Sequence, residues 1–236
     1  MKKVLLLVFV ACAFLALGGT AMADDLSFGL GVKGWYNDFK FAANNSGNNF
    51  TVKTKDPALM IGPTAKIGYG KYFAGVTYLT SATDYKLENS TEKVSRDDID
   101  VLVGYMLIPQ FGIVGGYKAI FLEGKYPGGT EKFKKQGGVL GVTGNVPLPL
   151  GLAVYGNLGG LYLTQEYTDT NFQTDLLDRD YYGFSVEAGL GYRIIAGLSA
   201  NLGYKYQGLY MIKKHSTDTS FDETYQGLTF GVDYRF

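Results

Sequence analysis

Apolar and polar residues alternate with a period of two through most of the chain after residue 24. Each alternating segment has about the 9–11 residues that a tilted β-strand needs to cross a membrane. No apolar run after residue 24 is long enough for a transmembrane helix. The segments lie at roughly 26–36, 58–69, 72–82, 97–107, 111–121, 137–146, 151–162, 182–194, 198–210 and 225–236.

The connections between these segments are alternately short and long. The short ones are Gly70-Lys71, Ile108-Pro109-Gln110, Pro147-Leu148-Pro149 and Ile195-Ala196-Gly197, and the long polar ones span about 37–57, 83–96, 122–136, 163–181 and 211–224. Tight turns at one end and long loops at the other are typical of an outer-membrane barrel. We therefore predict an all-β fold, a closed antiparallel up-and-down transmembrane β-barrel of about ten strands, with eight strands as the main alternative. An even strand number places both termini on one side, which we expect to be the periplasm.

The two faces of the segments differ in kind. In the segment 182–194, Tyr182, Phe184 and Val186 share one face, whereas Glu187 and Arg193 share the other with glycines. A lysine or arginine facing the middle of a bilayer would cost about 2–4 kcal/mol, so the charged face should line the lumen. In a narrow lumen we expect these charges to pair with one another. The predicted lumen network is Lys33, Lys66, Asp98, Asp100, Lys118, Glu187, Arg193, Lys205, Asp233 and Arg235.

One segment departs from this pattern. Within 111–121, Val114 and Ile120 lie on the same face as Lys118. Aromatic residues are expected to form belts at both ends of the apolar face, where amphipathic rings meet the headgroups. They are Tyr69, Tyr72, Tyr105, Phe111, Tyr192, Tyr234 and Phe236 near the short turns, and Tyr36, Tyr78, Phe121, Tyr162, Tyr182 and Tyr206 near the long connections.

The first residues resemble a secretory signal peptide. Lys2 and Lys3 precede an apolar run. Ala21-Met22-Ala23, which follows it, has the small-x-small form of a signal-peptidase site, in which Ala21 and Ala23 are the small residues before the cut. We expect residues 1–23 to be removed, together with Cys12, which is the only cysteine, leaving 24–236 as a single barrel domain. Removal of two lysines changes 22 basic residues to 20 against 22 acidic ones, a net charge of −2, which indicates no nucleic-acid partner.

The C-terminus carries a more specific pattern, because apolar or aromatic residues occupy alternate positions up to a final phenylalanine. These residues are Leu228, Phe230, Val232, Tyr234 and Phe236. Together with the signal peptide and the hairpin pattern, they resemble bacterial outer-membrane β-barrel proteins of the small outer-membrane β-barrel domain type. The resemblance implies that the terminal aromatic is the signal for the barrel-assembly machinery, and that the protein is integral to the outer membrane of a Gram-negative cell.

The sequence contains few candidates for chemistry. Gly29 to Gly34 spells G-x-G-x-x-G but lies within a strand, where a dinucleotide-binding turn would need a following helix. His215 is the only histidine, and with Ser216, Asp218 and the Asp98–Asp100 pair it superficially resembles omptin-type proteases or outer-membrane lipid hydrolases. We expect ion pairing for the aspartates and solvent for His215, and therefore no catalytic, cofactor or metal site and no enzyme.

Two loop clusters invite a binding role. Lys125, Lys132, Lys134 and Lys135 are placed to hold lipopolysaccharide phosphates, and Glu166, Asp169, Asp175, Asp178 and Asp180 to gather divalent cations; ordinary solvated charges are the simpler reading of both.

Three functions remain for such a chain. The first is a passive structural or small-pore role, the second is surface adhesion or ligand binding through the outer loops, and the third is an outer-rim protease or lipid-modifying enzyme. Outer-membrane lipid and lipopolysaccharide are the expected partners, and a monomer is the expected state.

Overall fold

The computed structural model describes residues 26–45, 48–88, 90, 92–126, 129–169, 179–212 and 220–236. No helix in these ranges is long and apolar enough to cross a membrane. The predicted signal peptide, with its cleavage site at Ala21 and Ala23, lies outside the described residues and stays a prediction. The strands are β1 (Leu26–Asn45), β2 (Asn48–Asp56), β3 (Ala58–Tyr69), β4 (Tyr72–Ser81), β5 (Tyr85–Leu87), β6 (Lys93–Ile108), β7 (Phe111–Tyr126), β8 (Gly129–Pro147), β9 (Leu152–Asp169), β10 (Arg179–Ile195), β11 (Leu198–Met211) and β12 (Ser220–Arg235).

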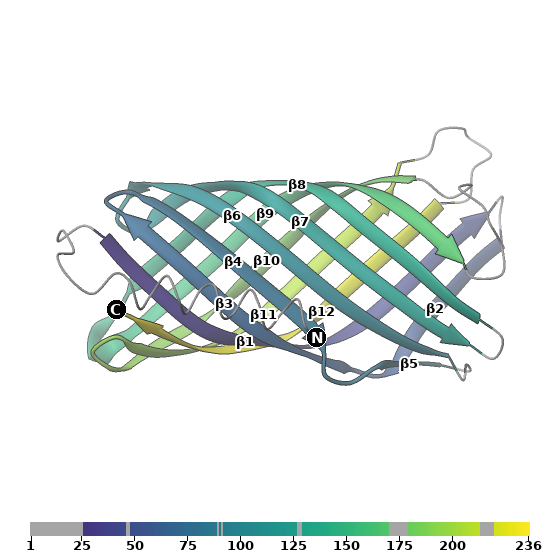
Figure 1. The fold of residues 1–236 in the computed structure, drawn as a ribbon, viewed down its shortest axis with the longest axis horizontal. Helices are drawn as coiled ribbons and strands as arrows, with labels where there is room; N and C mark the ends of the chain where they lie inside the picture. The colour runs from purple at the N-terminus through teal and green to yellow at the C-terminus, as the bar shows by residue number, and fades with distance from the viewer. Residues whose placement is uncertain are drawn as a thin grey trace.

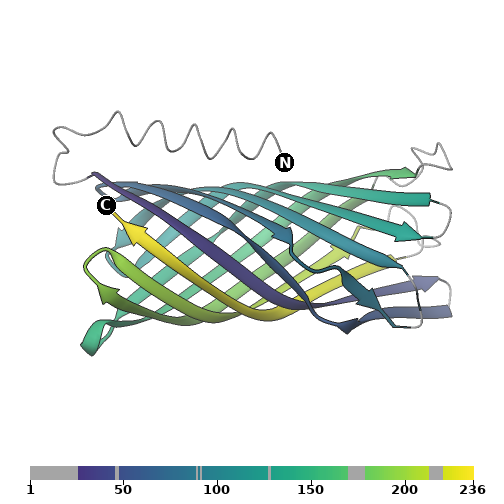
Figure 2. The ribbon, with the colours of Figure 1, turned by 60° about the horizontal axis from the view of Figure 1, so that its bottom comes forward.

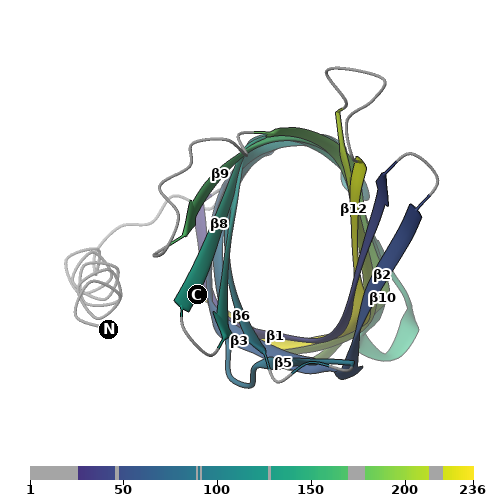
Figure 3. The same cartoon turned by 90° about the vertical axis from the view of Figure 1, so that its right-hand side faces the viewer.

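These strands close into a barrel. Neighbouring strands pair antiparallel, and β12 returns to pair with β1 from Gly29↔Arg235 to Asn44↔Ser220. Figure 2 shows the last strand beside the first, and Figure 3 shows the closed ring seen along its axis. The ring has ten strands, namely β1, β3, β4 and β6 to β12, so the predicted fold class is confirmed with ten strands rather than eight.

Two short strands, β2 and β5, complete the ring at the end of the barrel opposite the short turns, which we call the far end. Pro57 separates β2 from β3, because proline offers no N–H to the ladder, and a bend at Ala82–Asp84 separates β4 from β5. Beyond these interruptions β1 pairs with β2, β2 with β5 and β5 with β6. Between β1 and β6 the wall is therefore continuous along its whole height. β3 and β4 connect these strands nearer the short turns, and β2 and β5 connect them at the far end.

The strands run further than the apolar alternation predicts (Figure 1). β1 continues to Asn45, β6 begins at Lys93 and β9 continues to Asp169, so most residues of the predicted long connections are strand residues. The predicted strand ends are wrong here for a physical reason. Above the apolar band the outward side chains become polar, so the pattern fades although backbone pairing continues.

The short turns lie where the sequence predicts them. Gly70 and Gly197 have φ of 57° and 82°, a left-handed conformation that strains residues with a side chain, so glycine suits both turns. The described chain starts at Leu26 and ends at Phe236, and both lie at this short-turn end of the barrel (Figure 1).

The exposure of the side chains follows the predicted alternation. Outward residues such as Leu202, which is 59% exposed, form an apolar outer wall, whereas the alternate positions are buried through much of the barrel and become exposed near the short turns. Aromatic rings from both predicted belts, among them Tyr36, Tyr72, Tyr182 and Tyr234, are exposed on this outer wall. The remaining question is what fills the lumen.

Candidate functional site

The lumen joins residues from opposite sides of the barrel. Lys33 on β1 lies 2.7 Å from the Glu187 carboxylate on β10. The same carboxylate accepts hydrogen bonds from the Tyr155 hydroxyl at 3.3 Å and the Thr229 hydroxyl at 3.1 Å. Because a buried charge is costly unless it is paired and hydrogen-bonded, these contacts allow Glu187 to remain inside the barrel.

A second pair lies nearer the short turns. Lys66 is 3.1 Å from Asp233, which also accepts hydrogen bonds from Thr64 at 3.3 Å and Asn201 at 3.1 Å. Arg193 and Arg235, which we predicted to join the network, are exposed at this end. The described contacts of the network do not include these two arginines.

The most buried ionic group centres on Asp98 of β6. Arg96 donates to both of its carboxylate oxygens, at 2.6 and 2.7 Å, in a bidentate pair. Lys118 of β7 lies 3.2 Å from Asp98 and 2.8 Å from Asp100. The pairing predicted for both aspartates is therefore present, and Arg96 adds a cation that the sequence assignment placed in a loop.

Lys205 is held differently from the other lysines of the network. Among the described residues, no carboxylate oxygen lies within 4.0 Å of its ammonium, which instead lies 4.4 Å from the centroid of the Trp35 ring. The Arg96 guanidinium lies 5.2 Å from the same ring and 3.8 Å from that of Tyr225. Cation–π attraction is strongest where water is excluded, so these rings stabilise two buried cations.

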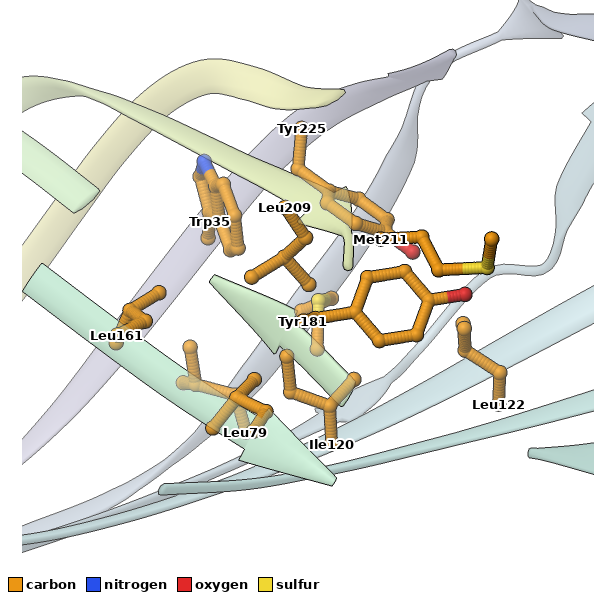
Figure 4. Close-up of a cluster of buried hydrophobic side chains, with 11 residues drawn as sticks. Trp35, Leu79, Ile120, Leu122, Leu161, Tyr181, Leu209, Met211 and Tyr225 are labelled. Carbon is orange, nitrogen blue, oxygen red and sulfur yellow. The ribbon is translucent and has the colours of Figure 1, made fainter. Parts of the chain in front are cut away.

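Apolar side chains occupy the lumen toward the far end of the barrel, and we call this group the luminal plug. Figure 4 shows side chains from several strands converging on one another inside the barrel. Trp35, Leu163, Leu209 and Tyr225 have an exposed fraction of 0%. The luminal plug consists of Trp35, Met60, Leu79, Ile120, Leu122, Leu161, Leu163, Tyr181, Leu209, Met211 and Tyr225.

Further polar contacts surround the plug. Lys135 lies 2.7 Å from Glu223, and the Tyr225 hydroxyl donates to the same carboxylate at 3.1 Å. The Tyr85 hydroxyl on β5 donates to Asn37 at 2.5 Å, and burial raises the pKa of that hydroxyl. Tyr85 therefore remains neutral and keeps its role as a donor at ordinary pH.

The polar contacts around the plug could not be predicted from the sequence, because Arg96, Lys135 and Glu223 lie in stretches predicted as loops. The irregular segment 111–121 does indicate an apolar interior, because its inward Ile120 belongs to the luminal plug. The lumen thus has a charged layer in the membrane and an apolar layer above it. Packed side chains occupy the barrel axis at the level of the plug, whereas Lys66 nearer the short turns remains exposed.

The binding clusters predicted in the loops are divided by the strands. Lys125 and Lys132 contact Glu123, Lys134 contacts Glu166, and Lys135 points inward. Asp175, Asp178, His215, Ser216 and Asp218 lie outside the described residues. Within the described ranges, no three His, Cys, Asp or Glu residues are grouped so that they could hold a metal ion. The glycine motif Gly29 to Gly34 lies inside β1, as predicted.

Comparison with solved structures shows the fold. The outer membrane protease OmpT from Escherichia coli is similar over 92% of this chain and 99% of its own, at 12% identity and a TM-score of 0.56. Neisserial surface protein A matches 88% of this chain and 97% of its own at 13% identity and a TM-score of 0.38. The attachment invasion locus protein Ail of Yersinia pestis matches 91% and 100% at 13% identity and a TM-score of 0.38.

Sequence comparison identifies the family. No curated protein sequence matches the chain. The family model of the OmpA-like transmembrane domain matches residues 64–236, which is most of the barrel. An outer-membrane β-barrel is therefore supported by the fold and by the sequence alike, and the chain belongs to the family of OmpA-like transmembrane domains.

Proposed function

We propose that this protein is a closed, non-conducting outer-membrane barrel whose role is to carry a rigid β-structured surface outside the cell. The luminal plug is the observation that carries the proposal. Its central side chains, including Trp35 and Leu209, are 0% exposed although they lie inside a barrel. An ion crossing at this level would have to leave water and pass between packed side chains whose charged neighbours are already paired with one another, which is strongly unfavourable.

The ionic layer supports the same conclusion. Arg96, Asp98 and Lys118 are buried and bound to one another, so they offer no row of free charges for a passing solute. Small barrels are generally filled by their own side chains. We therefore favour the structural role over the small-pore role.

The strands beyond the apolar band favour a second, compatible function in surface binding or adhesion. β1 and β12 remain paired as far as Asn44↔Ser220, well past the outward aromatic residue Tyr36. A surface built on paired strands is more rigid than free loops, and it therefore loses less conformational entropy on binding. On this proposal the short turns and both termini face the periplasm, the barrel is a monomer and the assembly machinery inserts it.

Planar-bilayer recording of the refolded chain tests the closed lumen. We expect no step conductance from the wild-type protein, and a sustained conductance would overturn the proposal. Trp35 supplies a second readout because it is the only tryptophan. Its fluorescence should resist aqueous iodide, and Leu209→Ala should increase the quenching. The matched control is Leu202→Ala on the lipid side of the same strand, which should leave iodide access unchanged.

A further inference from the structure

Lysines face lysines across neighbouring strands of the extramembrane wall. Lys40 on β1 is directly opposite Lys53 on β2. Lys93 on β6 is directly opposite Lys86 on β5 and Lys125 on β7. We call these five residues the lysine collar.

The collar faces outward rather than into the lumen. On β1 the inward residues Trp35 and Asn37 are buried, whereas Tyr36 and Lys40 share the exposed phase. Tyr85 and Leu87 of β5 are likewise buried on either side of the exposed Lys86. The collar therefore surrounds the outside of the barrel, where a lipid or a macromolecule can reach it.

Its height corresponds to the headgroup region. Lys40 follows the exposed belt residue Tyr36 by four positions on the same face, which is about 13 Å along a strand at ~3.3 Å per residue. With a strand tilt of about 40° the rise along the barrel axis is about 10 Å. The lysines therefore lie above the hydrocarbon, at the level of charged headgroups and the first sugars.

Like charges placed directly opposite each other destabilise a sheet. Lys86 is offset by Asp56 at 3.2 Å and Lys125 by Glu123 at 3.1 Å. Lys40, Lys53 and Lys93 have no carboxylate oxygen within 4.0 Å among the residues that the structure describes. Ion pairs among the described residues therefore do not explain why these three lysines are placed opposite other lysines.

Acidic side chains lie on the extramembrane wall as well, and some of them are close to the collar. At the corresponding positions of β9 to β12, the outward charged side chains in the described ranges are Glu166, Asp180 and Asp222. Asp38 shares the outward phase of Lys40 on β1, and Asp222 is on β12, which pairs with β1. The collar is therefore defined by its opposed lysine pairs and not by a uniformly basic sector.

We propose that the lysine collar binds the phosphate groups of lipopolysaccharide in the surrounding outer leaflet. The ligand is a phosphorylated glycolipid because the collar lies beside the membrane, faces outward and presents paired ammonium groups at headgroup height. Lysine ammonium groups bind phosphate as point charges without requiring one fixed geometry. The site is separate from the lumen, so a negative result for lipopolysaccharide binding would not contradict the proposal that the lumen is closed.

The test uses the full chain in nanodiscs of neutral phospholipid, titrated with fluorescent lipopolysaccharide. The triple variant Lys40→Gln, Lys53→Gln, Lys93→Gln removes three positive charges. It should bind about a hundredfold more weakly, at about fivefold for each lysine. Dephosphorylated lipopolysaccharide should bind the wild type at least tenfold more weakly. Lys71→Gln, in a turn at the other end of the barrel, is the matched control and should bind like the wild type.

Each variant is first checked for a heat-modifiable band and for protection of Trp35 from iodide, so that loss of folding is not read as loss of binding. Equal affinity of the triple variant and the wild type would overturn the proposal. So would equal affinity for intact and dephosphorylated lipopolysaccharide. Tighter binding of a soluble sulfated polysaccharide than of lipopolysaccharide would also overturn it, since the collar would then serve a partner outside the membrane.

Discussion

The Arg96 guanidinium on β6 lies 3.8 Å from the ring centroid of Tyr225 on β12. These strands are not neighbours in the ring, so the contact crosses the lumen. Arg96 also holds Asp98 in a bidentate pair. One side chain therefore joins the ionic layer to the luminal plug.

Removal of this cation should be severely destabilising. Arg96→Met leaves Asp98 buried with Lys118 as its remaining ion-pair partner, and we expect a loss of about 3–5 kcal/mol in the free energy of unfolding. Urea unfolding in lipid vesicles measures the loss.

The double variant Arg96→Met, Asp98→Asn removes one charge of each sign and leaves Lys118 with Asp100. It should recover a substantial part of the stability, so that the double-mutant cycle shows a favourable coupling. Strictly additive losses would contradict the contact described for these two residues.

The luminal plug should contribute far more to stability than the lipid-facing wall. Leu209→Ala creates a cavity among packed side chains and should cost about 2–5 kcal/mol. Leu202→Ala on the same strand should cost much less, because lipid chains can fill the space that it leaves. Unfolding midpoints of the two variants provide the comparison, and similar losses would show that the plug is loosely packed.

Two adjacent glycines of β8 should respond oppositely to alanine. A Cβ on the inward Gly137 would lie 2.1 Å from the Tyr162 carbonyl oxygen, whereas one on the outward Gly138 would meet nothing within 4 Å. Gly137→Ala should therefore impair folding, and Gly138→Ala should be neutral or slightly stabilising, because alanine loses less backbone entropy in a strand. The yield of heat-modifiable protein after refolding measures both.

The terminal residue should matter for assembly in cells but little for the finished barrel. The Phe236 ring is exposed, and its backbone N–H donates to the Phe28 carbonyl oxygen at 2.8 Å. Phe236→Ala keeps that hydrogen bond and should change the free energy of unfolding by no more than about 0.5 kcal/mol. If the assembly signal is correctly identified, the same variant should insert poorly in cells, and normal insertion there would remove the signal role.

Sequence periodicity predicts the membrane-spanning part of this barrel well, because lipid imposes a strict apolar face on every strand. Lys33 and Glu187, or Lys66 and Asp233, can be assigned to the lumen from parity alone, since no other face tolerates them. Their partners cannot be assigned in this way, because the ring brings together residues as distant in sequence as Lys33 and Glu187.

Outside the hydrocarbon the constraint disappears and prediction fails with it. The strand residues around Lys40 and Lys93 alternate between an inner face and water, which accepts most side chains. The luminal plug escaped notice for the opposite reason. Its inward leucines and aromatics resemble lipid-facing residues in kind. Their position is the informative signal, because Trp35 lies on the same strand face as Lys33 and Ile120 on the same face as Lys118.

The pairing of β2 with β1 and β5, and of β5 with β6, has a consequence for life on a cell surface. Peptides from unfolded neighbours and the clefts of many proteases capture chains by adding a strand to an unpaired sheet margin. Because β2 and β5 are paired with their neighbours, this part of the exposed wall has few free backbone groups to which a foreign polypeptide could add a strand.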